Sequence, residues 1–428
     1  MVMKKRFIST GTLFKSIPKL APDLVFDLKQ RYLKDTRKLK VDLGIGAYRD
    51  EYGKPFILPS VKLASTQLFK MIDFDHEYLP IRGDLNLLKS SFKILLDENY
   101  KNYKEILGKL VSIQTLSGTG SLHIANIFLK KFFNGNNIYI SSPSWGNHKQ
   151  IFQDFKILNY PYWNNKEKNL DINGFINCIK SAPSPSIFLL HTCGHNPTGV
   201  DPTYEQWIQI LKELYEKNHL PIFDTAYQGF CSGSFKMDSI VFKIICEFFP
   251  QMSFLVCQSF AKNFGLYSER IGCLHIIHKD SNHLLNQAIQ SQLERIIRTE
   301  YSNPPGYGAK IIATILTNNN LLKQWESDLS IMSKRISKMR FLLKKELIHL
   351  KTPGNWDHIT NQKGMFSFTG LSSDEVEKLE TNYAIYMLRN GRMSISGLNE
   401  QNVKYVAEAI DKVVRWKIEQ NCINSTKV

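Results

Sequence analysis

The chain has 428 residues, 43% of them hydrophobic and 22% charged, with a formal net charge of +16 at pH 7. This composition excludes wholesale disorder, and the length allows one large two-lobed unit or two to three domains. No apolar run reaches the roughly 18 residues that a membrane-spanning helix needs, so we expect no membrane association.

The positive charge and the cysteines each exclude a class of protein. The lysines are spread out, without a zinc-finger, helix-turn-helix or RNP-like pattern, so we expect attraction of small dianions and no nucleic-acid partner. The seven cysteines are scattered and odd in number, without a C-x-x-C pair. This pattern argues against a disulfide scaffold or a zinc cluster, and we expect a reducing compartment and no metal site.

The first 22 residues contain five basic side chains, several Ser and Thr, and no acid. This composition is typical of a mitochondrial transit peptide, and a short disordered basic tail is the alternative. We expect residues 1–20 to be a basic N-terminal segment directing the chain to the mitochondrial matrix, with the cytoplasm as the alternative location.

The following elements alternate between helix and strand. Residues 23–36 have a helical pattern, and the apolar run 41–48 (VDLGIGAY) contains Gly44 and Gly46. These glycines favour close approach of the backbone to a ligand, because the third glycine of a dinucleotide-binding loop is missing. We then expect strands at 111–116, 137–141, 155–160, 186–191, 220–224, 252–257 and 271–277, and helices at 121–133, 203–217 and 241–249.

This alternation predicts an α/β fold, with a mostly parallel sheet flanked by helices and a smaller α+β domain. Ligands of such sheets bind at the carboxyl ends of the strands. The elements expected beyond the sheet are long helices at 282–299 and 321–350, strands near 365–369 and 392–396, and a last helix at 399–418.

A candidate phosphate site lies between the strand 111–116 and the helix that follows it. The segment Ser117-Gly118-Thr119 offers hydroxyls and free backbone N–H groups at the positive end of a helix dipole. Such turns also cap helices that bind nothing, and no Gly-Lys-Ser/Thr follows, so this is not a Walker A loop.

Other strand ends carry an acid, an amide and aromatic rings. Asp224 closes the strand 220–224, where a buried carboxylate is costly unless a cation or hydrogen-bond donors meet it; a helix N-cap is the alternative role. Tyr227 can face the same site, and Asn196 lies in the turn sequence HNPTG. Trp145 follows the second strand, where its ring could stack on an aromatic cofactor or fill the core.

Lys262 follows the apolar strand 252–257 and lies between Ser259 and Arg270 in the sequence QSFAKNFGLYSER. Desolvation and a neighbouring cation lower a lysine pKa, which produces a nucleophile or a Schiff-base partner. The alternatives are a surface lysine and a Ser-x-x-Lys acyl hydrolase with Ser259 as nucleophile. The Ser-Asp-Asn and Lys-Thr-Gly companions of that motif are missing.

Together these groups match the needs of one cofactor, pyridoxal 5'-phosphate. The cofactor requires a phosphate cradle, a lysine for a Schiff base and an acid for its pyridinium nitrogen. These needs leave Arg298 and Arg392 without a role. Two arginines in one site would bind two carboxylates, because a guanidinium pairs bidentately with a carboxylate.

The chain resembles the aspartate aminotransferase family of fold-type I pyridoxal-phosphate enzymes from about residue 17 to residue 415. The resemblance rests on ten segments in the family's order: VDLGIGAYRDEYGKP, EYLPIRG, QTLSGTG, PSWGNH, HNPTG, DTAYQGF, QSFAKNFGLYSERIG, YSNPPGYGA, GMFSFTGL and NGRMSISGL. It implies a ping-pong transaminase acting on dicarboxylic amino acids and 2-oxo acids through pyridoxamine phosphate. Aromatic amino acids on the same scaffold are the alternative substrates.

The resemblance also implies roles for the site residues. Lys262 would bind the cofactor and move protons, with Asp224 on the ring nitrogen and Tyr227 and Asn196 on the ring oxygen. The other cofactor ligands would be Trp145 on the ring and Ser117, Gly118, Thr119, Ser259, Arg270 and the partner subunit's Tyr78 on the phosphate. The substrate would meet Arg392 at its α-carboxylate and the partner subunit's Arg298 at its distal carboxylate, with Gly46, Trp145, Asn196, Ser302 and Phe366 nearby.

Shared residues imply a homodimer. The resemblance further implies a large cofactor domain at 58–332 and a small domain built from 21–57 and 333–428. One departure from the family pattern is Arg82 in EYLPIRG, where an uncharged residue is expected, so the phosphate end would gain a cation.

Overall fold

The computed structural model describes residue 14 and residues 16–72 and 75–425. The proposed targeting segment 1–20 lies largely outside the described residues. Among the helices of the described residues, none combines the length and the apolar character needed to cross a membrane.

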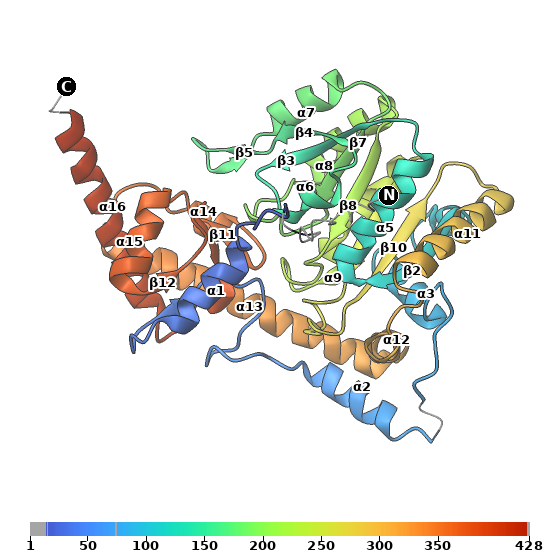
Figure 1. Ribbon diagram of the computed structural model, residues 1–428, viewed down its shortest axis with the longest axis horizontal. Helices are drawn as coiled ribbons and strands as arrows, with labels where there is room; N and C mark the ends of the chain where they lie inside the picture. Colours follow the sequence, from blue (N-terminus) through green and yellow to red (C-terminus); the bar gives the residue numbers. More distant parts are fainter. Residues whose placement is uncertain (1–13, 15, 73–74, 426–428) are drawn as a thin grey trace, which may run out of the picture.

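A seven-stranded sheet forms the centre of the larger part of the molecule (Figure 1). The strand order is β2-β10-β9-β8-β7-β3-β4, and β10 is antiparallel to both of its neighbours while the other pairs are parallel. The mostly parallel sheet is therefore confirmed. The bounds are β2 Leu110–Leu116, β3 Asn137–Ser142, β4 Lys156–Pro161, β7 Ile187–His191, β8 Leu220–Thr225, β9 Phe254–Ser259 and β10 Ile271–Ile277.

Alternate residues of each strand face opposite helical layers, because successive side chains of a strand point to opposite faces. Ile222 and Leu255 belong to the core cluster under α5 (Ser117–Phe132) and α11 (His283–Glu300). Phe223 and Val256 belong to the cluster on the other face, under α7 (Ile172–Ser181), α8 (Tyr204–Glu216) and α10 (Ile240–Phe248). Both faces are covered, as an α/β fold requires.

A 31-residue helix, α13 (Asn319–His349), connects the sheet-containing part to the smaller C-terminal part (Figure 1). It packs against α2 (Pro59–Phe69) and α12 (Tyr307–Thr317) at one end and against α16 (Val403–Ser425) further along. Trp325 on this helix is fully buried and donates from its indole nitrogen to the carbonyl of Asn263, at 2.8 Å.

The smaller part joins both ends of the chain. β1 (Val41–Asp42) pairs in parallel with β12 (Ile385–Tyr386), and β11 (Phe366–Phe368) pairs with β13 (Arg392–Ser394). The remaining elements are α1 Leu24–Lys34, α3 Leu85–Lys93, α4 Tyr103–Gly108, α6 Asn147–Ile151, β5 Trp163–Asn164, β6 Asn169–Leu170, α9 Phe235–Asp238, α14 His358–Asn361, α15 Ser373–Tyr383 and the 3-10 turn Ile395–Gly397.

Several boundaries differ from the sequence predictions. The helix expected to begin at residue 121 begins at Ser117, so the Ser-Gly-Thr segment forms its first turn. The last helix begins at Val403 instead of residue 399. The sequence pattern did not predict the helices α2, α4, α6, α7, α9, α12, α14 and α15.

Candidate active site

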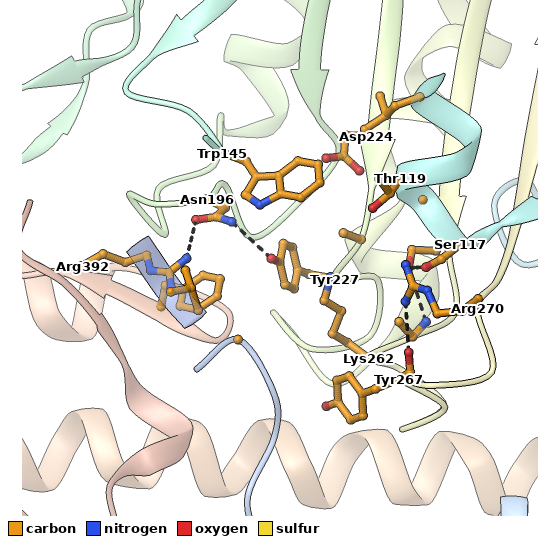
Figure 2. Close-up of a pocket in the computed structure, with 18 residues that line it drawn as sticks. Ser117, Thr119, Trp145, Asn196, Asp224, Tyr227, Lys262, Tyr267, Arg270 and Arg392 are labelled. Atoms are coloured by element: carbon orange, nitrogen blue, oxygen red, sulfur yellow. Dashed lines mark hydrogen bonds between the residues drawn. The ribbon is translucent and has the colours of Figure 1, made fainter. Parts of the chain in front are cut away.

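A cavity of about 280 Å³ opens at the carboxyl edge of the parallel strands (Figure 2). Strand ends supply most of its walls, since residues that follow β2, β3, β7, β8 and β9 meet there. The smaller part closes the opposite side. The lining residues are Val25, Gly46, Ser117, Gly118, Thr119, Leu122, Trp145, Asn196, Asp224, Ala226, Tyr227, Ser259, Ala261, Lys262, Tyr267, Arg270, Phe366 and Arg392.

At one end of the cavity, Asp224 is a buried carboxylate that hydrogen-bonds one histidine and has a second histidine nearby. His148 lies 3.0 Å from Asp224 Oδ2 and is itself bonded to Ser144 Oγ at 2.9 Å, while His191 lies 3.8 Å from the same oxygen. Burial opposes ionisation of Asp224, but the hydrogen bond and charge of His148, with the charges of His191 and Lys262, outweigh it and lower its pKa. Asp224 is therefore a carboxylate that can hold a proton on a ligand facing it.

Lys262 reaches the cavity from the turn after β9. Its ammonium lies 4.9 Å from the ring centroid of Tyr227. Burial lowers the pKa of Lys262. The negative charge of Asp224 raises this pKa, and the positive charges of Arg270 and Arg392 lower it further. A lysine in this setting loses its proton more readily than a solvated one, as a nucleophilic or proton-transferring amine must.

The opposite end of the cavity is built to hold an anion. α5 begins there at Ser117, and its N-cap Leu116 offers no side-chain bond to the first helical N–H groups, so these remain available to an anion in the cavity. Ser117 Oγ lies 3.0 Å from Ser259 Oγ, and Arg270 donates to the carbonyl of Tyr267 at 3.0 Å.

Close packing of backbone shapes this anion cradle. A Cβ on Gly118 would lie 3.0 Å from Ser259 Cβ, and a Cβ on Gly272 would lie 2.5 Å from the carbonyl carbon of Ser117. Ser117 itself has φ 64°, a conformation that residues other than glycine rarely adopt. Only glycine at 272 lets the cradle lie directly against β10.

A chain of hydrogen bonds connects the ring of Tyr227 to the smaller part (Figure 2). Asn196 donates to Tyr227 Oη at 3.4 Å and accepts from Arg392 at 3.4 Å. Arg392 also donates to the carbonyl of Gly44 at 2.8 Å, and its guanidinium lies 4.3 Å from the ring centroid of Phe366.

Arg392 is a buried cation without a carboxylate partner among the described residues. Its side chain is 6% exposed, and its Nε has no hydrogen-bond partner. Burial lowers its pKa to about 10, although the phenol of Tyr227 opposes the shift. A carboxylate ligand would remove this penalty, because a paired buried charge costs much less than an unpaired one.

These observations fit pyridoxal phosphate. The uncapped start of α5, two hydroxyls and Arg270 can bind its phosphate. Asp224 can pair with a protonated ring nitrogen, and Lys262 can form a Schiff base with its aldehyde. The hydrolase alternative finds no support, because Ser259 Oγ is occupied by Ser117 Oγ and by the N–H of Ala261, at 3.3 Å.

Three predicted site residues lie outside this cavity, namely Tyr78, Arg298 and Ser302. Tyr78 is 81% exposed, and Arg298, in the last turn of α11, is also exposed and donates to Ser302 Oγ. Arg82 does not line the cavity of its own chain either: its Nε donates to the carbonyl of Ser112 at 2.9 Å, and its side chain faces another hollow with Lys89. That it adds a cation at the phosphate stays a prediction.

Several groups at the site had no role predicted from the sequence. His148 holds Asp224 and His191 lies beside it, Gly272 makes room for the cradle, and Tyr267 and Val25 line the cavity. The position of His148 just after Trp145 was the available signal, because it follows the same strand end.

Comparison with known proteins gives consistent matches. Residues 38–410 match the family described as "Aminotransferase class I and II". The chain is 50% identical over 412 residues to the cytoplasmic aspartate aminotransferase of Saccharomyces cerevisiae, covering 95% of this chain and 98% of the relative.

Solved structures give the same result. The structure of aspartate aminotransferase from Saccharomyces cerevisiae cytoplasm matches with a TM-score of 0.92 and 50% identity, covering 95% of this chain and 99% of that one. An aromatic-amino-acid aminotransferase from Burkholderia pseudomallei, covalently bound to pyridoxal phosphate, matches with a TM-score of 0.90 and 34% identity, covering 94% and 100%.

Proposed function

Because the chain belongs to the class I and II aminotransferases, we propose that it catalyses the reversible transfer of the amino group between L-aspartate and 2-oxoglutarate, giving oxaloacetate and L-glutamate. The observation that carries the proposal is the joint placement of Lys262, Asp224 and Arg392 around one cavity. An amine, a carboxylate and an unpaired guanidinium are the three groups that this reaction needs from the protein.

Pyridoxal phosphate, when bound, supplies an aldehyde carbon and a ring that accepts electrons. The N–H groups at the start of α5, with the hydroxyls of Ser117 and Thr119 and the guanidinium of Arg270, would hold its phosphate. Trp145 would cover its ring, and Tyr227 and Asn196 would donate hydrogen bonds to its ring oxygen.

Proton transfer is the work of Lys262 and Asp224. Lys262 Nζ would take the α-proton of the amino acid and deliver a proton to the carbon on the other side of the amino nitrogen. Its lowered pKa favours this role, because the amine must be neutral to accept a proton. Asp224, kept ionised by His148, holds a proton on the ring nitrogen and so keeps the ring electron-accepting.

Substrate choice rests on two arginines. Arg392 binds the α-carboxylate beside Gly46 and Phe366, where its guanidinium has no carboxylate partner among the described residues. We assign the distal carboxylate to the partner subunit's Arg298, because Arg298 and Ser302 of this chain bond each other and do not line its own cavity.

A homodimer is therefore part of the proposal. Large exposed apolar side chains on and around α2 support it, since a contiguous exposed apolar surface marks an interaction site. They are Ile57, Leu63, Phe69, Met71 and Ile72, and Tyr78 follows them with 81% exposure. The partner subunit's Tyr78 would reach the phosphate of this subunit.

The test is direct. Purified protein should absorb as a bound pyridoxal chromophore and change spectrum when aspartate is added without an oxo acid; borohydride reduction should leave the cofactor on Lys262 by peptide mass spectrometry. An adduct elsewhere, or none in cofactor-saturated protein, would refute the proposal.

Aromatic substrates remain the second candidate, because the Burkholderia pseudomallei protein of that name has a TM-score of 0.90. Arg298→Ala separates the two: aspartate turnover should fall by 10²-fold or more, about 3 kcal/mol, while phenylalanine turnover changes little. Equal losses would contradict the role of Arg298.

Domain limits and location are also proposals. We assign residues 58–332 to the cofactor domain, and residues 21–57 and 333–428 to the small domain, which the β1–β12 pairing supports. The composition of residues 1–20 supports a mitochondrial matrix location, and the cytoplasmic relative favours the alternative. Fluorescence microscopy of a protein fused behind residues 1–22 distinguishes them.

A further inference from the structure

Two of the seven scattered cysteines come together beside the active site. Cys193 follows strand β7 and is 5% exposed, while Cys231 follows strand β8 and is partly exposed. The carboxylate of Asp238, at the end of α9, completes a group in which one ligand atom of each residue lies within 4.8 Å of the others. No part of the transamination chemistry uses these three groups.

We propose that Cys193, Cys231 and Asp238 bind one thiophilic divalent cation of the zinc and cadmium class, and that its binding inhibits the enzyme. Two sulfurs and one carboxylate oxygen are ligands that such ions accept. With bonds of about 2.3 Å to sulfur and about 2.0 Å to oxygen, tetrahedral ligand atoms lie about 3.5–3.8 Å apart, so a contraction of at most about 1 Å brings these three atoms to bonding distance.

The carboxylate of this trio is already oriented. Asp238 accepts the N–H groups of Gly229 at 2.8 Å and of Cys231 and Ser232 at 3.0 Å. The turn that carries Cys231 is thus folded around the carboxylate, and the sulfur and oxygen cannot drift apart independently. Because Cys231 is partly exposed, an ion can enter from its side.

The charges around the sulfurs also favour a cation. The hydrogen bond with Cys231 stabilises a Cys193 thiolate, but burial and the carboxylates of Asp238, Asp201 and Asp224 raise the Cys193 pKa to about 12. The hydrogen bond with Cys193, burial and the same negative surroundings raise the pKa of Cys231.

Two cations face this group from other elements. Arg340 of α13 interacts with Cys231, and Lys363 interacts with the carboxylate of Asp201. Each thiol gives up its proton when its sulfur binds the ion, so one ion displaces two protons as two S–H bonds are exchanged for two metal–sulfur bonds.

Binding at this site reaches the active site through short connections. A Cβ on Gly194 would lie 2.9 Å from Cys231 Sγ and 3.1 Å from Tyr227 Cβ, so sulfur, backbone and ring are in contact. Gly194 lies two residues before Asn196, which donates to Tyr227. Drawing the two sulfurs together shifts both groups that hold the cofactor ring.

Titration of the cofactor-loaded protein with Cd²⁺ tests the site, with calorimetry and the ultraviolet thiolate-to-cadmium absorption as readouts. We expect one ion per subunit, the absorption of two thiolates and release of two protons. Cys231→Ala and Cys193→Ala should lose the absorption, whereas Cys422→Ala, at an exposed cysteine, should retain it. Circular dichroism and thermal unfolding without metal show that each variant is folded.

Two results would overturn the proposal. The first is full cadmium absorption in folded Cys231→Ala or Cys193→Ala, or no thiolate absorption in the wild type. The second is inhibition that persists unchanged in Cys231→Ala, because we expect the wild type to lose most activity at one bound ion and to recover it with a chelator. The binding readouts do not depend on the proposed reaction, so a failure of either proposal is distinguishable.

Discussion

Replacing Arg392 by methionine separates the effect of this arginine on the unfolding free energy from its effect on the rate of the reaction. Methionine retains much of the apolar contact with Phe366 and removes the charge. Burial lowers the Arg392 pKa from 12.5 to about 10, which corresponds to about 3 kcal/mol against the charged form in the folded protein.

Against this cost stand two hydrogen bonds and the contact with the Phe366 ring. These contacts contribute about 2–3 kcal/mol together. The two sums nearly cancel, so we expect Arg392→Met to change the unfolding free energy of the apoprotein by less than about 1 kcal/mol.

The effect on catalysis should be much larger. Without the guanidinium, the α-carboxylate of the substrate is buried unpaired, at a cost of about 3–5 kcal/mol, which lowers kcat/KM for aspartate by about 10²- to 10⁴-fold. The measurements are urea unfolding of the apoprotein and initial rates of oxaloacetate formation. Arg389→Met, at a half-exposed arginine that pairs with Glu377 and Glu380, is the control for activity.

Arg340→Met is the control for stability. Arg340 is equally buried but donates to four backbone carbonyls, of Ile359, Lys363, Gly364 and Phe366, which its loss would leave unpaired. We expect it to destabilise the protein by about 3 kcal/mol or more. If Arg392→Met is as destabilising as Arg340→Met, or lowers kcat/KM no more than Arg389→Met, the reasoning is refuted.

Three further predictions concern groups around the site and in the sheet. His148→Ala should raise the pKa of Asp224 and lower the unfolding free energy in urea by about 2–3 kcal/mol, because the carboxylate loses its hydrogen bond at 3.0 Å. The control Ser144→Ala should lower the unfolding free energy by less than about 1 kcal/mol, and equal losses in the two variants would contradict the prediction. Gly272→Ala should weaken cofactor binding to the apoprotein at least tenfold in equilibrium dialysis, because its Cβ meets Ser117 at 2.5 Å; Gly108→Ala, with open space around it, should bind normally. His275 has a pKa of about 3 because of burial, so its neutral form stabilises the fold above pH 6.5, and this stability is lost as pH falls toward 3. Between pH 7 and pH 4 the loss is about 3 kcal/mol, and the urea midpoint of His275→Asn should fall less steeply with pH than that of the wild type or of His283→Asn.

The sheet was predictable because its strands are short apolar runs that end in polar residues. Asp224 and Lys262 were identified from this pattern alone, and both line the cavity. Helix α12 was not found, because most of its sides are buried and its apolar residues show no clear periodicity. The early start of α5 was missed because Ser117, Gly118 and Gly120 are poor helix formers, and tertiary packing against β9 and β10 overrides that preference.

The direction of the Arg82 side chain could not be predicted for a different reason. The turn before α3 runs alongside β2, and the N–H of Gln114 donates to the carbonyl of Arg82 at 2.9 Å. This pairing directs the side chain along the strand toward Ser112 and away from Ser117. A motif gives the order of residues along the chain but not the direction of a side chain, which the neighbouring strand decides.

The two ends of the cavity are prepared in opposite ways, and this difference accounts for the chemistry we propose. Asp224 has a hydrogen-bond partner in place, because His148 lies 3.0 Å from its carboxylate before any ligand arrives. Arg392 is buried with an unpaired Nε, so its charge is compensated only when a carboxylate binds. The acid can therefore hold a ring proton throughout the reaction, because its environment does not change. The arginine instead gains its full interaction from each substrate carboxylate in turn, which suits a site that must bind and release two different acids in each cycle.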